Sequence, residues 1–330
     1  MILVTGGAGY IGSHVTKKLL DNNYEVLILD NFSTGFVEPL EILRQKYNGL
    51  SYINCDLGDS EKLNEIFAKN IIEAVIHLAA KIDVAESVLK PELYHQENYL
   101  NSVNLAEQMT LVGVNKIIFA STAAVYGDPK YTPIDENHPV NPLNPYASTK
   151  FDFEKYLSKC QNLKYVIFRF FNVGGSDEGG LIGKSHLKSQ DILENLIKVG
   201  LNQKEFFEIF GSDFDTADGT AVRDLVHVED IAEAISSALK KIDSISGETI
   251  NLGSETGFSV KEIISEAEKV IQSKIPTQMI ARRPGDLSVS VASAEKANRL
   301  LGWTHINSEP GKIIRSDWQW RKTHPVGYKI

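Results

Sequence analysis

The chain has 330 residues, 42% of them hydrophobic, and its 34 basic and 43 acidic side chains give a formal net charge of −9. This length is typical of two domains, or of one large domain with an extension. An acidic chain without a cluster of Lys and Arg repels phosphate backbones, which disfavours nucleic acid as a partner. The two cysteines, Cys55 and Cys160, allow at most one disulfide, as is typical of proteins in reducing compartments.

The sequence contains no recognisable targeting or membrane segment. Met1 leads directly into a short apolar run, without the basic region that opens a signal peptide. No apolar run is long enough to span a bilayer, and no group of His, Asp and Glu has the spacing of metal ligands. We therefore expect a cytoplasmic protein that binds neither a membrane nor a metal ion.

The first half of the chain alternates short apolar runs with amphipathic stretches. Runs rich in Ile, Val, Leu and Phe predict strands at residues 2–4, 25–29, 51–54, 74–78, 116–120 and 164–170. Helical patterns occupy residues 11–22, 60–68, 91–112 and 145–160. Near-continuous apolar strands separated by helices indicate a parallel sheet covered on both faces. The predicted fold is α/β, with a doubly wound parallel sheet of the Rossmann type.

The pattern changes in the second half. Five prolines within residues 128–145 exclude regular structure there, and a segment of this length is usually functional or disordered. A glycine-rich turn follows at residues 174–180, and helices are predicted near residues 191–201, 228–242, 259–271 and 311–323. We predict a first domain of residues 1–171 and a smaller α/β substrate domain of residues 172–330, partly interleaved around residues 223–255.

The segment Thr5–Gly12, with the sequence TGGAGYIG, joins the first predicted strand to the first predicted helix. Its glycines Gly6, Gly9 and Gly12 let the backbone turn tightly and approach a pyrophosphate at the start of the helix. Asp30 ends the second strand, where a carboxylate accepts hydrogen bonds from an adenosine ribose. Because this carboxylate would repel the 2′-phosphate of NADP, the predicted cofactor is NAD.

Two further sets of polar residues have alternative interpretations. Asp56 and Leu57 follow the third strand and are placed to hold an adenine, although Asp56 could instead cap the helix that begins near residue 60. His77 and His227 lie in apolar contexts, and we interpret them as packed structural histidines.

Tyr146 and Lys150 have the Tyr-x-x-x-Lys spacing. Residues four apart share one face of a helix, so the phenol and the ammonium can line the same cleft. We expect Lys150 to lower the pKa of Tyr146 towards the range of a general base. Thr122, at the carboxyl end of the fifth strand, adds a hydroxyl where ligands bind in open α/β sheets.

Together these features resemble the extended short-chain dehydrogenase/reductase family and, within it, the UDP-glucose 4-epimerases and related nucleotide-sugar 4-epimerases. The resemblance continues over most of the chain, in segments 86–88 (ESV), 98 (N), 169–172 (RFFN), 209–214 (IFGSDF), 218–224 (DGTAVRD), 226–228 (VHV), 282–286 (RRPGD), 301–303 (LGW) and 324–328 (HPVGY). It implies an isomerase that oxidises a UDP-hexose at C4 to a 4-keto sugar and reduces it on the opposite face. It also implies a homodimer that pairs through helices 91–112 and 145–160.

The resemblance assigns roles to individual residues. Tyr146 would remove the proton from the sugar 4-hydroxyl, Lys150 would bind the nicotinamide ribose, and Thr122 would share the proton path. The residues expected to bind NAD are Gly6, Gly9, Tyr10, Ile11, Gly12, Asp30, Asn31, Asp56, Leu57, Ala79, Ala80, Lys81, Asn98, Thr122, Tyr146, Lys150 and Phe171. The residues expected to bind the UDP-sugar are Thr122, Tyr146, Asn172, His186, Leu187, Ile209, Phe210, Arg223, Arg283 and Ser290.

Some positions depart from the family pattern. Lys81 comes one position before the usual lysine, and the segment at His186 and Leu187 lacks the usual proline. Ser290 replaces a bulky tyrosine found in relatives restricted to glucose and galactose, so the pocket is predicted to accept UDP-GlcNAc and UDP-GalNAc as well.

Alternative functions remain at this point. A UDP-pentose 4-epimerase, acting on UDP-xylose and UDP-arabinose, is not excluded by any residue. A nucleotide-sugar 4,6-dehydratase is disfavoured, because Thr122 is followed by Ala123 and Ala124 rather than by an acidic pair. A non-catalytic NAD-sensing protein is disfavoured because Tyr146 and Lys150 are both present.

Overall fold

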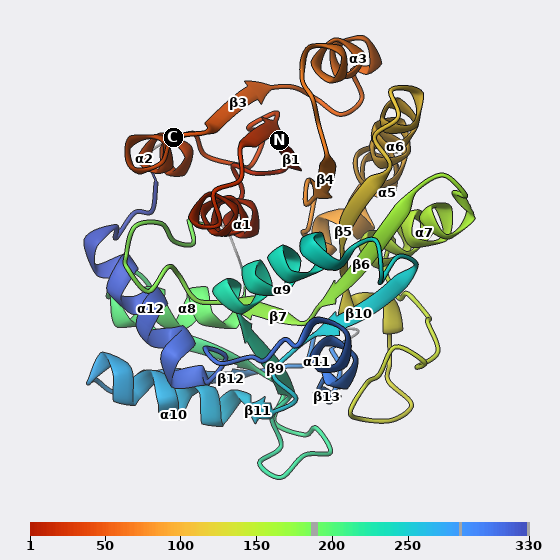
Figure 1. The fold of residues 1–330 in the computed structure, drawn as a ribbon. Helices are drawn as coiled ribbons and strands as arrows, with labels where there is room; N and C mark the ends of the chain where they lie inside the picture. The colour runs from red at the N-terminus through yellow and green to blue at the C-terminus, as the bar shows by residue number, and fades with distance from the viewer. Residues whose placement is uncertain (186–190, 284–285, 329–330) are drawn as a thin grey trace.

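The computed structural model describes residues 1–185, 191–283 and 286–328. Within these residues, the centre of the molecule is a seven-stranded parallel sheet in the order β10-β6-β5-β4-β1-β2-β3 (Figure 1). Its strands are β1 (Ile2–Thr5), β2 (Val26–Asp30), β3 (Leu50–Asn54), β4 (Ala74–His77), β5 (Lys116–Thr122), β6 (Lys164–Phe170) and β10 (Glu248–Leu252). The strand order reverses between β1 and β4, so the predicted doubly wound α/β fold is confirmed.

The strands are apolar on both sides because helices cover both faces of the sheet. Ile2 and Val4 of β1 pack into one core and Leu3 into the other. The first core is closed by α1 (Tyr10–Asp21), α2 (Glu38–Lys46) and α9 (Val228–Lys241), and the second by α3 (Ser60–Lys69), α6 (Asn101–Leu111) and α7 (Pro145–Lys159). Figure 1 shows α1 and α9 side by side and α6 and α7 across the sheet from them.

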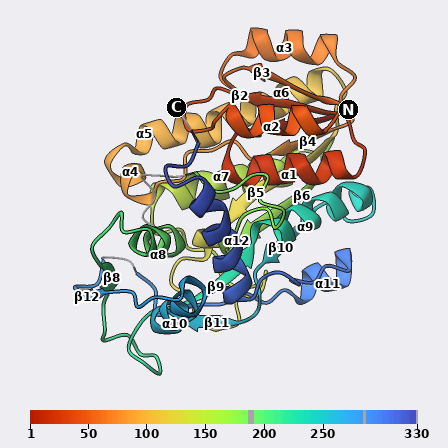
Figure 2. The ribbon, with the colours of Figure 1, turned by 90° about the vertical axis from the view of Figure 1, so that its left-hand side faces the viewer.

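The later part of the chain forms smaller sheets with a core of their own (Figure 2). In one sheet β9 (Val222–His227) pairs with β7 (Asn172–Gly174), β11 (Gly257–Ser259) and β13 (Val289–Ser290), and in another β8 (Phe207–Phe210) pairs with β12 (Thr277–Ile280). The helices of this part are α8 (Ile192–Gly200), α10 (Val260–Ile271), α11 (Glu295–Leu301) and α12 (Pro310–Thr323). Because α9 and β10 return to the seven-stranded sheet, the chain crosses between the two parts more than once.

The helix predicted over residues 91–112 is divided into three pieces. It begins as α5 (Pro91–Tyr94), continues as a π-helix, η1 (His95–Leu100), and ends as α6. The sequence pattern, interpreted as one continuous helix, did not indicate this wider π-turn. Such turns often occur at functional sites.

Other elements were missed because few of their residues are apolar and buried. Helix α2 buries Pro39, Leu40 and Leu43, and α4 (Val84–Leu89) buries only Ser87. The strands of the smaller sheets are two to six residues long, too short for a clear alternation. A short 3₁₀-helix, η2 (Ala123–Tyr126), follows β5 directly.

The proline-rich segment is irregular, as predicted. Residues 128–144 contain neither a helix nor a strand, and a single bridge pairs Ile134 with Ala292. Cys55 and Cys160 are free thiols. No helix in the described part of the chain combines the length and the apolar character needed to cross a membrane.

Candidate active site

The glycine loop lies between β1 and α1. Gly6 has a φ of +71°, and a Cβ at this position would lie 2.6 Å from the backbone nitrogen of Ala79, so glycine is required there. A Cβ at Gly12 would lie 2.1 Å from the carbonyl oxygen of Gly6. Gly9 is the N-cap of α1 and supplies no capping side chain, and the first turn of the helix carries no acidic residue. The start of α1 therefore suits a bound anion.

Tyr10 is the first residue of α1, but its phenol is hydrogen-bonded to a distant part of the same chain. The hydroxyl donates a hydrogen bond to the carbonyl of Gly175, and the Lys184 ammonium lies 5.1 Å above the ring. Burial raises the pKa of Tyr10 well above its usual range. The side chain therefore ties the loop to the second half of the chain.

Asp30 lies beside the glycine loop at the carboxyl end of β2. Its carboxylate accepts a hydrogen bond from the Ala8 N–H at 3.0 Å and another from the Phe32 N–H at 2.9 Å. Burial raises the pKa of Asp30, and the two N–H donors oppose this rise. The predicted ribose-binding carboxylate and the predicted phosphate loop are thus adjacent.

Asn31 and Asp56 are in direct contact after β2 and β3. The Asn31 amide donates to a carboxylate oxygen of Asp56 at 2.8 Å, and the Gly58 N–H donates to the other oxygen at 2.8 Å. The alternative interpretation of Asp56 as a helix cap is wrong, because Asp59 caps α3 by accepting a hydrogen bond from the Lys62 N–H. Leu57, next along the chain, is buried.

The loop after β4 is fixed by the π-helix. Asn98 of η1 is buried, and its amide pairs with both backbone groups of Lys81, at 2.8 Å to the N–H and 2.9 Å to the carbonyl. Ala79 and Ala80 precede Lys81, and the Ala79 N–H points to the Thr5 hydroxyl at 3.4 Å. Asn98 therefore holds the backbone of residues 79–81 close to the glycine loop.

Tyr146, Lys150 and Thr122 meet at the carboxyl end of β5. Asn144 caps α7 by accepting a backbone hydrogen bond, which places Tyr146 in the first turn. One turn later the Lys150 Nζ donates to the Ala120 carbonyl at 2.8 Å. The phenol of Tyr146 lies near the hydroxyl of Thr122, close enough for this hydroxyl to influence the pKa of Tyr146. The strand-end hydroxyl and the Tyr/Lys pair thus form one cluster.

The surroundings of this cluster shift both pKa values. Burial lowers the pKa of Lys150 to about 7, and the nearby Glu154 carboxylate opposes this change. Burial raises the pKa of Tyr146, and the nearby Thr122 hydroxyl opposes the rise. Burial therefore has the larger effect on the pKa of Tyr146 in this structure, Thr122 opposes it, and the lowering expected from Lys150 stays a prediction.

Phe210 and Arg223, expected to bind a nucleotide diphosphate, lie on the smaller sheets, and Arg283 lies in the segment after β12. The Arg283 guanidinium stacks 4.3 Å from the centre of the Phe210 ring and pairs with Asp286 at 3.0 Å. Arg223 of β9 donates to the carbonyl of Leu287 at 2.8 Å. Burial lowers the pKa of Arg223, Asp286 opposes this, and Arg283 adds to it, so the two arginines are electrostatic neighbours.

The other predicted substrate residues follow the same strands. Ser290 of β13 is the register partner of Arg223, so it lies next to the arginine pair. Asn172 begins β7 and is exposed, whereas Ile209 of β8 and Phe171 are buried. Ile11, in the first turn of α1, packs against the first core. His186 and Leu187 lie outside the described residues.

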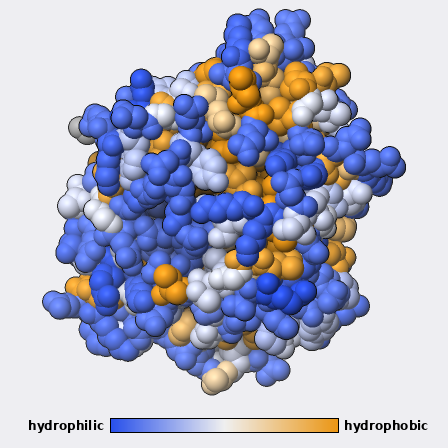
Figure 3. All heavy atoms as spheres, in the orientation of Figure 1, coloured by the Kyte–Doolittle hydropathy of each residue, from blue (hydrophilic) through white to orange (hydrophobic). Residues whose placement is uncertain are grey.

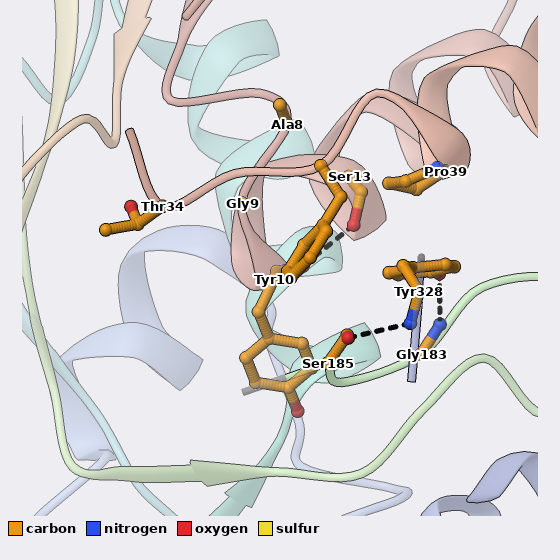
Figure 4. A pocket seen from close by; sticks show the side chains of 10 residues that line it. Ala8, Gly9, Tyr10, Ser13, Thr34, Pro39, Gly183, Ser185 and Tyr328 are labelled. Carbon is orange, nitrogen blue, oxygen red and sulfur yellow. Dashed lines mark hydrogen bonds between the residues drawn. The ribbon is translucent and has the colours of Figure 1, made fainter. Parts of the chain in front are cut away.

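A small pocket separates the glycine loop from the end of the chain (Figure 4). Tyr328 closes it, with its N–H donating to Ser185 at 2.8 Å and its hydroxyl accepting from the Gly183 N–H at 2.9 Å. Its volume of about 10 Å³ admits no more than a water molecule. A wider hollow of about 340 Å³ lies against α1 and α9 and contains none of the predicted site residues.

The sequence analysis did not identify the polar groups behind the Tyr/Lys pair. Glu154, buried on α7, accepts from Arg169 of β6 at 3.1 and 2.5 Å and from the Ser121 hydroxyl. Glu154 lies four residues after Lys150, and this spacing was the available signal. His77 and His227 are buried and hydrogen-bonded within the chain, as interpreted. In residues 1–185, 191–283 and 286–328 no group of His, Cys, Asp or Glu is arranged to hold a metal ion.

Comparison with known proteins agrees with this geometry. The model of the NAD dependent epimerase/dehydratase family matches residues 2–253. The chain is 40% identical to the UDP-glucose 4-epimerase of Halalkalibacterium halodurans, over 99% of this chain and 97% of the relative. The crystal structure of UDP-glucose 4-epimerase from Bifidobacterium longum, in complex with NAD⁺ and UDP, superposes with a TM-score of 0.93 at 34% identity and covers 99% of each chain.

A third relative is the UDP-Glc/GlcNAc 4-epimerase of Campylobacter jejuni, whose structure superposes with a TM-score of 0.86 at 35% identity, over 98% of this chain and 99% of that one. The family model covers well over half of the chain, and the relatives align along nearly all of it. On these grounds, the chain belongs to the NAD dependent epimerase/dehydratase family.

Proposed function

We propose that this chain is an NAD-dependent epimerase that interconverts UDP-glucose and UDP-galactose by inverting C4 of the sugar. The observation that carries the proposal is the cluster of Tyr146, Lys150 and Thr122 at the carboxyl end of β5, on the same edge of the sheet as the glycine loop. Relatives about 40% identical over their whole length are UDP-glucose 4-epimerases, which supports the same reaction here.

The glycine loop fits the pyrophosphate of NAD. A Cβ built on Gly9 would lie 3.2 Å from the carbonyl oxygen of Gly6, a tight contact, and would meet no other atom within 4 Å, so this side of the loop is otherwise open to a ligand. The uncapped start of α1 would hold the phosphates, and Asp30 would accept hydrogen bonds from the adenosine ribose. The contacts of Asp56, Leu57, Ala79 and Ala80 with the cofactor belong to this proposal.

The chain's own groups would manage the proton of the sugar 4-hydroxyl. Tyr146 would accept this proton, and Thr122 would donate a hydrogen bond that stabilises the phenolate. Lys150 would hold the nicotinamide ribose, because its ammonium has two further donors besides the one given to Ala120. When bound, NAD supplies the oxidant that takes hydrogen from C4 and later returns it.

Arg223 and Arg283 would anchor the UDP diphosphate. Each guanidinium can donate two parallel hydrogen bonds to phosphate oxygens. Phe210 already stacks on Arg283 and would keep its plane oriented. With the diphosphate fixed, the oxidised sugar is free to turn and present its other face before reduction.

A wider substrate range is the second part of the proposal. Ser290 is small and lies beside Arg223, which leaves volume for a 2-acetamido group next to the sugar. The similar structure from Campylobacter jejuni is described as a UDP-Glc/GlcNAc 4-epimerase. We therefore include UDP-GlcNAc and UDP-GalNAc among the proposed substrates.

The chain is also proposed to form a homodimer through the face that carries α4 to α7. Exposed apolar side chains lie there, with Val88 61%, Leu89 81% and Leu100 41% exposed. Figure 3 shows apolar residues gathered on the side where Figure 1 draws α6. Leu100→Lys should convert a dimer to a monomer in analytical ultracentrifugation, and an unchanged mass would contradict this interface.

The test of the main proposal is epimerisation by the purified chain. UDP-galactose, UDP-GalNAc and UDP-arabinose would be incubated separately with the protein, and the epimers quantified by chromatography. We expect UDP-glucose from UDP-galactose, and NAD in the supernatant after acid denaturation. If NAD-saturated protein left UDP-galactose unchanged but converted UDP-arabinose, the pentose alternative would replace the proposal.

A further inference from the structure

The residues behind the Tyr/Lys pair connect one helix face to three consecutive strand residues. Tyr146, Lys150 and Glu154 are spaced by four on α7 and therefore share one face. The Lys150 ammonium donates to the carbonyl of Ala120, and the next strand residue, Ser121, donates its hydroxyl to Glu154. The third strand residue is Thr122, whose hydroxyl lies near the phenol of Tyr146 and opposes the rise of its pKa. Each member of the helix face thus has its own partner at the end of β5.

Glu154 is the centre of this arrangement. Its side chain is only 5% exposed, and Arg169 of the neighbouring strand β6 donates hydrogen bonds to both carboxylate oxygens. Ser121 and Arg169 are register partners in the β5–β6 pairing, so the carboxylate fastens two strands and a helix at one point. Planar, two-pronged contacts of this kind fix orientation as well as distance.

The charge of Glu154 also reaches Lys150. Lys150 is 3% exposed, and its ammonium lies 4.8 Å from the centre of the Phe119 ring. Burial lowers the pKa of Lys150, and Glu154 is the group that opposes this fall. On the facing elements, His77 of β4 is neutral because its pKa is about 3, and Arg169 of β6 is already paired with Glu154.

We propose that Glu154, held by Arg169 and Ser121, is a positioning residue for the reaction: it aligns residues 120–122 with the Tyr146–Lys150 face and supplies the carboxylate that keeps the buried Lys150 ammonium charged. The inference rests on the proposed function, since it assumes that the ammonium and the phenol act on the bound ligands. Glu154 itself is hydrogen-bonded to Ser121 and Arg169 rather than to either of these two side chains.

The test is the pH profile of Glu154→Gln, which keeps the size of the side chain and removes its charge. Loss of a nearby opposite charge should move the alkaline limb of kcat to lower pH by about one unit. On that limb kcat should fall about tenfold, with the KM for UDP-galactose unchanged. Glu154→Asp keeps the charge and should retain the position of the limb. An unshifted limb in Glu154→Gln would overturn the proposal.

A matched control is available in the other half of the molecule. Glu194 of α8 is likewise buried and receives two hydrogen bonds from Arg321, at 2.7 and 2.9 Å. Glu194→Gln should lower the melting temperature to a similar degree and leave the pH profile unchanged. An equal shift of the limb in both variants would show that loss of stability, rather than the position of Glu154, is responsible.

A second measurement needs no turnover. In protein labelled with [¹³C]lysine, the Cε resonance of Lys150, assigned with Lys150→Met, reports its protonation as the pH changes. Glu154→Gln should lower the midpoint of this titration by about one unit. If the wild type failed to epimerise any UDP-sugar, the proposed function would be wrong. This titration would still test whether Glu154 keeps the Lys150 ammonium charged. An unchanged midpoint would contradict that role.

Should Glu154→Gln fail to fold, Glu154→Met combined with Arg169→Met replaces both charges by apolar groups of similar volume, a change that buried ion pairs often tolerate. This variant also lacks the carboxylate and should show the same shift of the alkaline limb. Ser121→Ala removes a donor without removing charge, so it should lower kcat about threefold and leave the limb in place. A limb that stayed in place in the double variant would contradict the proposal.

Discussion

The two sides of the candidate site hold their cations in different ways. Lys150 lies within a fifteen-residue helix, packed on a seven-stranded sheet, and is 3% exposed. The side chain of Arg283, by contrast, is 46% exposed and follows a strand of four residues. The proposed proton-handling groups are thus desolvated and fixed before any ligand arrives, whereas the proposed diphosphate-binding group can adjust to its ligand. The former arrangement tunes reactivity, and the latter allows a sugar to turn.

The largest effect should come from Tyr146→Phe, on the rigid side. Losing the proposed general base should reduce kcat about 10³-fold, while the loss of one hydroxyl leaves packing in place. The measurement is conversion of UDP-galactose, with thermal unfolding as the control for folding. If the variant kept activity close to that of the wild type, Tyr146 would not be the general base, and the proposed difference between the two sides of the site would be contradicted.

The next effect should come from Arg223→Met, on the side proposed to bind the diphosphate. A charge-assisted hydrogen bond to phosphate contributes about 1.5–3 kcal/mol, so KM for UDP-galactose should rise about 10- to 150-fold with kcat little changed. Arg282→Met is the matched control, because Arg282 pairs with Asp213 and stacks on Phe214. A lower kcat with an unchanged KM would mean that Arg223 acts in the chemical step.

Ser290→Tyr should separate the two groups of proposed substrates. The added ring would occupy the volume assigned to a 2-acetamido group, so kcat/KM for UDP-GlcNAc should fall about 10²-fold while UDP-galactose is little affected. Ser290→Ala, which adds no volume, should leave both substrates unchanged. If the tyrosine variant slowed both sugars equally, the position would not control specificity.

The last prediction concerns acid stability, on which a buried histidine in each half of the molecule should have a similar effect. The pKa of His77 beside β1 is lowered to about 3, and so is that of His227 at the start of α9, in both cases chiefly by burial. The unfolded chain takes up these protons near pH ~6.5 but the folded chain does not, so stability is present above that pH and is lost as pH falls towards 3.

Each such histidine should cost up to about 1.4 kcal/mol of unfolding free energy per pH unit over that range. The check is the urea midpoint at several pH values for the wild type, His77→Asn and His227→Asn. Each variant should lose a similar part of the slope between neutral and acid pH. Unequal losses would indicate that one half of the molecule opens first in acid.

The sequence revealed those parts of the site whose residues are close together along the chain. The glycine loop, Asp30 and the Tyr146–Lys150 spacing all belong to single elements or to one strand–helix–strand unit, where backbone geometry determines which side chains meet. Pairs such as Arg223 with Ser290 depend on the register of short strands far apart in the chain. No local pattern encodes that register.

The same limit explains the missed network and the missed π-turn. Glu154 and Arg169 meet because a helix and a strand pack in one particular alignment, which the apolar pattern of either element leaves open. Asn98 could be identified by resemblance, but its contact with the Lys81 backbone requires a turn that the apolar spacing does not indicate. The effect of burial on the pKa of Tyr146 was also missed, because it depends on packing that the sequence does not show.

The position of β10 has a consequence for how the protein is made. This strand pairs with β6 at the rim of the large sheet, yet the chain reaches it only after the strands β7, β8 and β9. During synthesis on the ribosome, β6 is therefore an edge strand with unpaired N–H and C=O groups. Such groups can pair with strands of other chains. In a fragment truncated after residue 171, the edge of β6 would stay unpaired. Such a fragment should therefore aggregate rather than fold as an independent cofactor-binding domain.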